Sequence, residues 1–288
     1  MPYDPQQTKY PYTERTDQHY LVVKKDNGTV FDENYPYVDY SKKAKVTGFF
    51  VNLVLYVLML PFCRLWYGIR IKGRKNLKIY KNELANGAIT VSNHVHLFDY
   101  IFIKTTLRKK NARVLVWKRN VSSENGKLIR GVGGIPIPDN DFKATMAFFD
   151  KTKEFASAPK TWLQIYAEGS MWEYYQPIRP FKEGAAYFAI KANKPVIPIA
   201  FSYRKSSWFR KNIMRVPACF NIAIGEPLFA NKELKAKQAE EDLTIRLHDS
   251  VCRLAGIDPD KNLYPPVFKN NKRIDYYTTE YGVKKKAK

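Results

Sequence analysis

The stretch AITVSNHVHLFDY, residues 88–100, contains the change of pattern that decides the fold of this chain. Its first part, Ala88–Ser92, is rich in small and β-branched residues, which is typical of a buried strand. The part that follows has helical composition, and we predict a helix over Leu97–Lys109. A strand that passes through a short polar turn into a helix indicates an α/β domain.

The same alternation continues towards the C-terminus. Further buried strands are predicted at Ala112–Trp117, Trp162–Tyr166, Val196–Phe201 and Phe220–Ile224. Further helices are predicted at Asp141–Phe155, Gly184–Asn193 and Lys232–Ala255. We therefore expect an α/β fold with a mixed central sheet flanked by helices, which occupies residues 71–260.

Two segments precede this domain. Residues 1–41 are polar and lack sustained periodicity, so we expect an N-terminal extension. Residues 42–70 contain a nearly continuous apolar run, interrupted by Asn52 and Pro61. A helix over that run would be about 25 Å long, short of a hydrocarbon core of roughly 30 Å. With basic residues on both flanks, it is expected to dock on the cytoplasmic face of the cell membrane without crossing it; a buried core helix is the alternative.

The amino-acid composition limits the kinds of partner that the chain is expected to have. Its 288 residues carry 49 Lys and Arg against 27 Asp and Glu, a formal net charge of +22. We expect an anionic membrane surface as partner and no nucleic acid, because no recognisable nucleic-acid-binding motif is present. Three widely spaced cysteines match neither a disulfide framework nor a zinc site and indicate a reducing compartment. Residues 261–288 are expected to form a basic C-terminal tail, and the first residues lack a secretory signal pattern.

His94 and Asp99 form the first candidate site, at the predicted strand-to-helix turn. There the carboxylate of Asp99 can fold back onto one imidazole nitrogen of His94. The other nitrogen is then left to take a proton from a substrate hydroxyl. His94 and His96 also form a His-x-His pair, so a metal-dependent hydrolase is an alternative. No cysteine cluster accompanies the pair, and we expect no metal.

A second group of candidate residues follows the predicted strand at Trp162–Tyr166. Glu168, Gly169 and Ser170 stand at its C-terminal end, the edge of an α/β sheet where ligands bind. Gly169 would allow a backbone amide to face a developing oxyanion, and Glu168 would hold a polar acceptor group.

A third group lies just before the predicted helix start at Gly184. Arg179 and Lys182 place two cations there, and a helix N-terminus adds its own attraction for an anion. The pattern therefore predicts a phosphate site. Upstream, Gly131–Pro138 is rich in glycine and proline and is interpreted as a loop.

In their order and spacing, these motifs resemble the 1-acylglycerol-3-phosphate acyltransferases, a family of lysophospholipid acyltransferases. The resemblance rests on Asn93-His-x-x-x-x-Asp99, Gly134-Ile-Pro-Ile137, Glu168-Gly-Ser170, Phe181-Lys-x-Gly184, Val196-Ile-Pro-Ile199 and Gly225-Glu-Pro-Leu228. It implies transfer of a fatty acyl group from acyl-CoA or acyl carrier protein to a lysophospholipid hydroxyl, with phosphatidic acid as product. It also implies that His94 is the base, that Asp99 orients it, and that no cofactor is needed.

The sequence departs from that family at two positions where the family usually has arginine. These positions hold Asp139 and Met171. Arg179 would then replace the missing arginines, or the acceptor is a lysolipid or glycolipid without that phosphate. A non-catalytic lipid-binding protein would explain the charge but not the His94–Asp99 pair. A serine hydrolase is disfavoured because the chain has no Gly-x-Ser-x-Gly motif.

Overall fold

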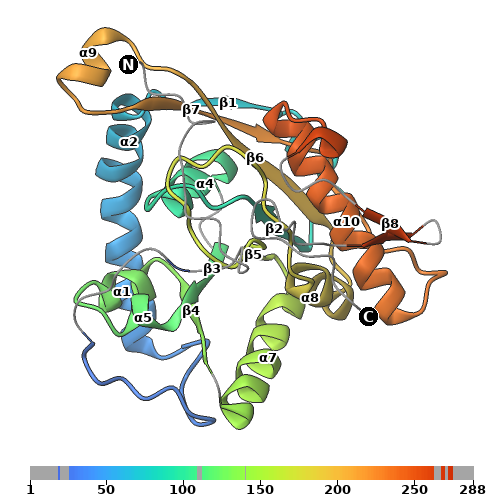
Figure 1. Cartoon of the computed structure of the whole chain (residues 1–288). Helices are drawn as coiled ribbons and strands as arrows, with labels where there is room; N and C mark the ends of the chain where they lie inside the picture. Colours follow the sequence, from blue (N-terminus) through green and yellow to red (C-terminus); the bar gives the residue numbers. More distant parts are fainter. Residues whose placement is uncertain are drawn as a thin grey trace.

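The computed structural model describes residue 19 and residues 26–108, 112–139, 141–262, 267–269 and 272–274. Within them, seven strands form one sheet in the order β1-β7-β6-β2-β5-β3-β4 (Figure 1). The sheet strands are β1 Arg70–Lys72, β2 Gly87–Ser92, β3 Ala112–Trp117, β4 Gly134–Ile137, β5 Thr161–Tyr166, β6 Val196–Lys205 and β7 Ala218–Ile224. A separate pair, β8 Val267–Lys269 and β9 Lys272–Ile274, lies in the segment predicted as a basic tail, most of which falls outside the described residues.

Helices connect many of these strands. They are α1 Lys42–Val54, α2 Leu60–Trp66, α3 Asn76–Ile79, α4 Asp99–Leu107, α5 Lys118–Val121, α6 Gly126–Gly131, α7 Phe142–Ser157, α8 Gly184–Ala192, α9 Trp208–Asn212 and α10 Ala236–Ala255, with a π-helical segment η2 Leu55–Met59 and a 3-10 turn η3 Pro259–Lys261. Every strand and helix predicted from the sequence within the domain is present, and the ends of most of them are shifted. The prediction of a mixed sheet flanked by helices is confirmed.

The direction of the strands brings several carboxyl ends to one edge of the sheet. Neighbouring strands run parallel except β6 and β7, which pair antiparallel. β2 lies between β5 and β6, at the centre. The carboxyl ends of β2, β5, β3 and β4 therefore share the edge at which such sheets bind ligands.

The strand β4 corrects the interpretation of Gly131–Pro138 as a loop. It pairs with β3, with Val116 opposite Pro136. Proline removes a backbone donor, which an edge strand tolerates because one of its sides has no neighbour. β4 is the last strand of the sheet, so Pro136 does not prevent pairing there.

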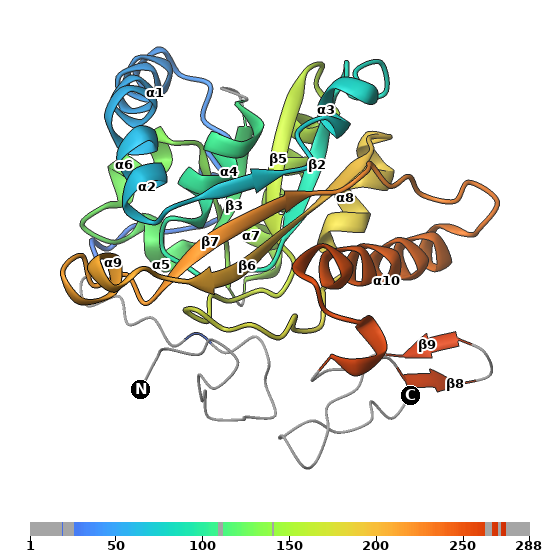
Figure 2. The same cartoon turned by 90° about the horizontal axis from the view of Figure 1, so that it is seen from above.

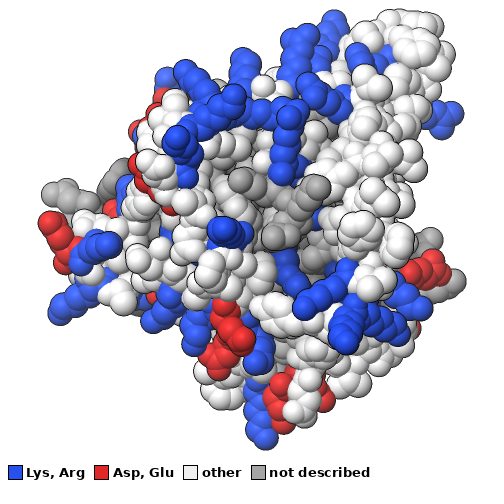
Figure 3. Space-filling model, turned by 180° about the vertical axis from the view of Figure 1, so that it is seen from behind, with Lys and Arg blue, Asp and Glu red and all other residues white. Residues whose placement is uncertain are grey.

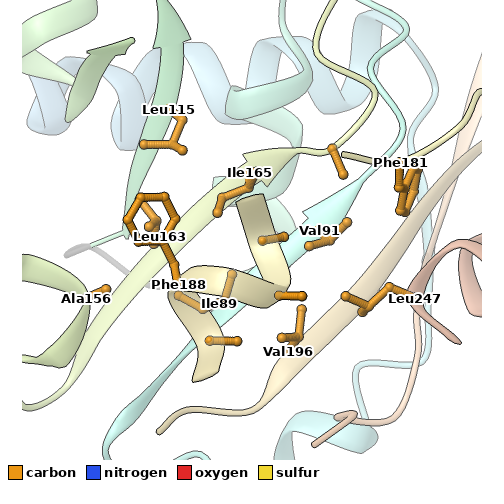
Figure 4. Packing of buried hydrophobic residues seen from close by; sticks show 14 of the residues in the cluster. Ile89, Val91, Leu115, Ala156, Leu163, Ile165, Phe181, Phe188, Val196 and Leu247 are labelled. Atoms are coloured by element: carbon orange, nitrogen blue, oxygen red, sulfur yellow. The ribbon is translucent and has the colours of Figure 1, made fainter. Parts of the chain in front are cut away.

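Two apolar clusters fill the two faces of the sheet. One lies against α8 and α10 and includes Ile89, Phe188 and Leu247 (Figure 4). The other lies against α4 and includes Ala88 and Phe102. Figure 2 shows α8 and α10 on the side of the sheet opposite α1 and α2. Successive residues of β2 thus enter opposite clusters, which explains its continuous apolar composition.

Part of the expected N-terminal extension belongs to the core. Tyr37 has no exposed surface, and its ring meets Phe148 edge-on with 5.8 Å between centroids. Arg130 on α6 donates from Nη1 to the carbonyl oxygen of Tyr37 at 2.8 Å, which holds the segment against the domain. Residues 1–41 are therefore polar overall but include a short segment that belongs to the core.

The apolar N-terminal segment forms one continuous helix, in which η2 joins α1 to α2. It covers 25 residues, Lys42–Trp66, of which an 18-residue stretch has a mean hydropathy of 2.1, and it is long and apolar enough to cross a membrane. At 1.5 Å per residue its length is about 37 Å, which exceeds the length predicted from the apolar run alone. Pro61 does not break it, because it lies in the first turn of α2, directly after the change in hydrogen-bonding pattern at η2.

One side of this helix is fastened to the domain. Nδ2 of Asn52 donates to the carbonyl oxygen of Gly131 at 3.2 Å, and its Oδ1 accepts from Nζ of Lys104 at 2.6 Å. Asn52, predicted to interrupt the apolar run, therefore binds the helix to α4 and α6. The other side presents exposed apolar side chains, which include Val46, Phe49, Phe50, Leu53, Val54, Val57, Leu58, Phe62 and Leu65.

Candidate active site

The turn between β2 and α4 is fixed by a side chain that bonds to the neighbouring strand. Asn93, the first residue after β2, donates from Nδ2 to the carbonyl oxygen of Phe201 at 3.0 Å and accepts from the amide of Phe201 at 2.8 Å. Its side-chain amide thus makes the same pair of hydrogen bonds to β6 that the backbone of a neighbouring strand would make. The next residue, His94, is held at the carboxyl edge of the central strand.

His94 and Asp99 lie side by side in this turn. Nδ1 of His94 is 2.9 Å from Oδ2 of Asp99, and the Asp99 side chain is fully buried. The same Oδ2 accepts from the amides of Val95 at 2.7 Å and His96 at 3.0 Å. Because Oδ2 acts as an acceptor in these contacts, Nδ1 carries the proton and Nε2 presents its lone pair.

The imidazole of His94 is oriented from a second side by Tyr166, the last residue of β5. Their rings stack with 3.9 Å between centroids and 13° between planes. The His94 side chain is 24% exposed, which leaves one edge of the ring accessible. Burial, aided by the nearby charge of Asp99, raises the pKa of Tyr166 well above its ordinary value, so its phenol stays neutral. The arrangement can therefore present Nε2 to a substrate hydroxyl.

Glu168 and Arg179 form a buried ion pair behind His94. Oε2 of Glu168 accepts from the His94 amide at 2.8 Å and from Nη2 of Arg179 at 2.8 Å. Both side chains are 1% exposed, and the guanidinium lies 4.5 Å over the ring of Trp172. The sequence predicted an open phosphate site at Arg179 and an acceptor contact at Glu168. Both groups are instead buried, and Glu168, paired with Arg179, accepts from the backbone amide of His94.

Of the other three predicted binding residues, Ser170 is buried, and Gly169 and Lys182 are exposed. Ser170 is buried, and its Oγ accepts from Nη1 of Arg179 at 2.7 Å. Gly169 has φ +82°, and its amide donates to the carbonyl oxygen of Tyr166 at 3.0 Å. That amide therefore closes a turn instead of facing an oxyanion. Lys182 is exposed, and its Nζ would lie 3.2 Å from a Cβ added at Gly169, which places the ammonium beside this turn.

His96 lies in an aromatic cluster and not beside His94 in a shared site. Its ring contacts those of Tyr67, Phe98, Phe102, Tyr174 and Phe220. Its Nδ1 accepts from the amide of Phe98 at 3.1 Å, and burial lowers the pKa of its imidazole. Across the described ranges, no group of three or more His, Cys, Asp and Glu side chains could hold a metal ion. His96 therefore packs as a core residue.

Lys118 is a candidate that the sequence did not single out. It directly follows β3, and its Nζ lies 3.4 Å from Oδ2 of Asp139, just past β4. The two side chains are 30% and 40% exposed. β3 pairs with β5 in parallel, with Val114 opposite Gln164, so this ion pair stands at the same sheet edge as His94. A cation directly after a predicted strand is the signal that would have found it.

A histidine held by a buried carboxylate at the carboxyl edge of an α/β sheet is the arrangement of a class of enzymes that activate a hydroxyl group. Residues 68–202 match the family model described as Acyltransferase, and this part of the chain belongs to that family. The prediction of an acyltransferase from the ordered motifs is thereby confirmed, and the lysophospholipid acceptor stays a prediction.

One similar solved structure is the crystal structure of the 1-acyl-sn-glycerophosphate (LPA) acyltransferase PlsC from Thermotoga maritima. Its sequence identity to this chain is 15% and the TM-score is 0.45. The match covers 74% of this chain and 84% of that chain.

Proposed function

We propose that this protein transfers a fatty acyl group from an acyl thioester to the hydroxyl of a lysophospholipid at a membrane surface. The observation that carries the proposal is the His94–Asp99 pair, with 2.9 Å between Nδ1 and Oδ2, inside a domain of the acyltransferase family. Acyl transfer follows from the family, and the roles of the two residues follow from their chemistry.

His94 acts as the general base. Its Nε2 takes the proton of the acceptor hydroxyl as the oxygen attacks the thioester carbonyl, while Asp99 stabilises the imidazolium that forms. The carbon–sulfur bond then breaks, and the thiolate leaves and takes up the proton. The ester bond replaces the thioester bond, so the chemistry requires neither a cofactor nor an acyl-enzyme. Acyl-CoA and acyl carrier protein both supply such a thioester.

The acceptor that we expect first is 1-acylglycerol-3-phosphate, which would give phosphatidic acid. The exposed ammonium of Lys182, beside the turn at Gly169, supports an anionic head group near the base. Lys118 supplies a second cation at the same edge. Ammonium groups bind phosphate as point charges, without the bidentate geometry of arginine.

A different lysolipid or glycolipid acceptor is the second candidate, and one observation favours it. Asp139 lies 3.4 Å from Lys118, so a carboxylate already neutralises the cation at that strand end. Arg179, which was expected to replace the missing arginines, is buried and paired with Glu168. An acceptor without a phosphate monoester avoids repulsion by Asp139.

The exposed apolar side of the N-terminal helix supports a position on the cytoplasmic face of the cell membrane. Asn52, in the middle of the helix, is bonded to the domain, which supports a helix that docks on the bilayer over one that crosses it. The helix would then lie in the interface with its apolar side towards the acyl chains. Figure 3 shows Lys and Arg side chains gathered along the upper part of one face, beside a column of uncharged surface, which suits an anionic leaflet.

A panel of lysolipid acceptors tests the proposal. The purified protein is given acyl-CoA or acyl carrier protein thioester with 1-acylglycerol-3-phosphate, 1-acylglycerophosphocholine or a monoacyl glycolipid, and thiol release and lipid products are measured. We expect thiol release that depends on acceptor and is lost in His94→Ala. No thiol release with any pair would refute acyl transfer to lysolipids. Release with the glycolipid alone would select the second candidate.

A further inference from the structure

The connection between β6 and β7 carries an uncovered group of apolar side chains. Trp208, Phe209 and Ile213, on and just after α9, are 73%, 57% and 59% exposed. Single exposed apolar side chains are common, but three within one short segment form a patch. None of them belongs to either apolar cluster of the sheet, so the packing of the core does not account for them.

The same segment is strongly basic. Residues 205–215 contain no Asp or Glu and four cations, which are Lys205, Arg210, Lys211 and Arg215. The nearest acidic residues along the sequence are Glu183 and Glu226. Aromatic and aliphatic side chains interleaved with Lys and Arg are the composition of segments that lie in the interface of an anionic membrane.

The α9 segment adjoins the end of the N-terminal helix. Nη2 of Arg210 donates to the carbonyl oxygen of Leu65 at 3.1 Å. Leu65 itself is 72% exposed, and Phe62, one turn earlier, is 49% exposed. Figure 1 shows α9 directly beyond the end of α2. The exposed apolar side of the N-terminal helix therefore continues onto α9.

The segment also projects from the sheet edge that carries the candidate active site. β6 runs parallel to β2, with Ile199 opposite Ser92, and continues as a strand to Lys205. At 3.3 Å per residue, this extension advances the chain by about 20 Å past the end of β2 before α9 begins. α9 therefore lies on the side towards which the turn with His94 emerges.

We propose that α9 is a second membrane-docking element, in which Trp208, Phe209 and Ile213 enter the head-group region of an anionic leaflet and the surrounding cations contact lipid phosphates. The inference deepens the proposed function and rests on it, because it assumes a lipid substrate at a membrane. Together with the N-terminal helix, α9 defines two contacts on one side of the molecule. Those contacts direct the carboxyl edge of the sheet, with His94, towards the lipid surface.

Vesicle binding by the full chain tests the proposal. Binding is measured by flotation with vesicles of phosphatidylcholine alone or with added phosphatidylglycerol. We expect Trp208→Ser/Phe209→Ser to weaken binding to the mixed vesicles at least about tenfold, since the two aromatic side chains that enter the head-group region are lost. Lys211→Glu should weaken binding to the mixed vesicles only. The matched control is Phe142→Ser, since Phe142 is 79% exposed but starts α7, far from α9 in Figure 1.

Three results would overturn the assignment of α9. They are wild-type binding by the double variant, an equal loss in Phe142→Ser, and a change of oligomeric state in the double variant, which would assign the patch to a second copy of the chain. Activity on water-soluble short-chain substrates is measured in parallel, and the double variant should retain it. If the wild type releases no thiol, the proposed function fails, while the vesicle experiment still decides whether α9 binds membranes.

Discussion

Arg179 and Glu168 form an ion pair inside the protein, with Nη2 and Oε2 separated by 2.8 Å and both side chains 1% exposed. Both groups have further partners, because Oε2 also accepts from the amide of His94 and the guanidinium also donates to Ser170. Arg179 therefore acts on the candidate base through Glu168. We therefore expect a positioning role for Arg179, so its replacement should affect the fold of the site more than the affinity for a lipid.

Replacement of Arg179 by Ala should destabilise the protein strongly. Removing one partner of a buried pair leaves the carboxylate of Glu168 uncompensated, which typically lowers the free energy of unfolding by about 3–5 kcal/mol. Urea denaturation followed by fluorescence measures it. The control is Lys153→Ala, whose partner Asp150 is exposed, with an expected change below about 1 kcal/mol. Unchanged stability with weaker acceptor binding would restore the direct role that the sequence predicted.

Replacement of the two histidines should have different consequences. His94→Ala should lower the turnover number by about two to four orders of magnitude, because general base catalysis contributes that much. His96→Ala should lower stability, because His96 fills an aromatic cluster, and should retain most of the turnover of folded protein. Thiol-release kinetics and thermal unfolding of both variants separate the effects. Equal losses of turnover, restored by added zinc, would favour the metal-dependent alternative.

The helices and strands with strong local patterns could be predicted from the sequence. So could the one pair of site residues that lie close together in the sequence. His94 and Asp99 are five positions apart, so the strand-to-helix turn alone brings them together. Arg179 and Glu168 meet only through the long segment after β5, whose path no local pattern fixes. For the same reason, the burial of Tyr37 could not be predicted from the polar segment around it. Non-local contacts of this kind follow from packing and not from periodicity.

Tyr37→Ala should be much more destabilising than its place in a polar extension suggests. The buried ring packs edge-on against Phe148, and large-to-small replacement of buried aromatic side chains costs about 3–5 kcal/mol. Denaturation midpoints measure the loss. Tyr40→Ala is the neighbouring control, because Tyr40 is 49% exposed and should matter little. A variant lacking residues 1–66 should also be unstable, because it loses Tyr37 and the bonds from Asn52 to the domain. Equal midpoints for Tyr37→Ala and wild type would place this segment outside the cooperative core.

The buried ammonium of Lys104 should make stability depend on alkaline pH. Burial, assisted by the nearby Arg113, lowers the pKa of Lys104 from 10.5 to about 8. Between these two values the unfolded chain binds more protons than the folded chain, so the free energy of unfolding should rise with pH from about 8 to 10.5. Lys104→Met should flatten this rise. Part of it should remain, because burial also lowers the pKa of Lys194 to about 8.

The experiment for Lys104 is urea denaturation at a series of pH values from 7 to about 10.5, the window set by the two pKa values. The control is Lys127→Met on α6, an exposed lysine whose replacement should leave the pH profile unchanged. An identical profile for Lys104→Met and wild type would mean that Lys104 is solvated in the folded protein. That result would also weaken the role of its bond to Asn52 in fastening the N-terminal helix.

Asp139→Asn should change acceptor preference if Lys118 binds a head-group phosphate. The carboxylate of Asp139, 3.4 Å from the ammonium of Lys118, competes with any anion there. Its neutralisation should lower the apparent KM for 1-acylglycerol-3-phosphate by about fivefold, the effect of roughly 1 kcal/mol for a partly exposed charge pair. Lys118→Ala should raise that KM, and the kcat of both variants should stay near wild type, because neither side chain contacts His94. Lys191→Ala, near the end of α8, is the control. If only the KM for an uncharged acceptor responds, the phosphate is not bound at this strand end and the glycolipid candidate gains support.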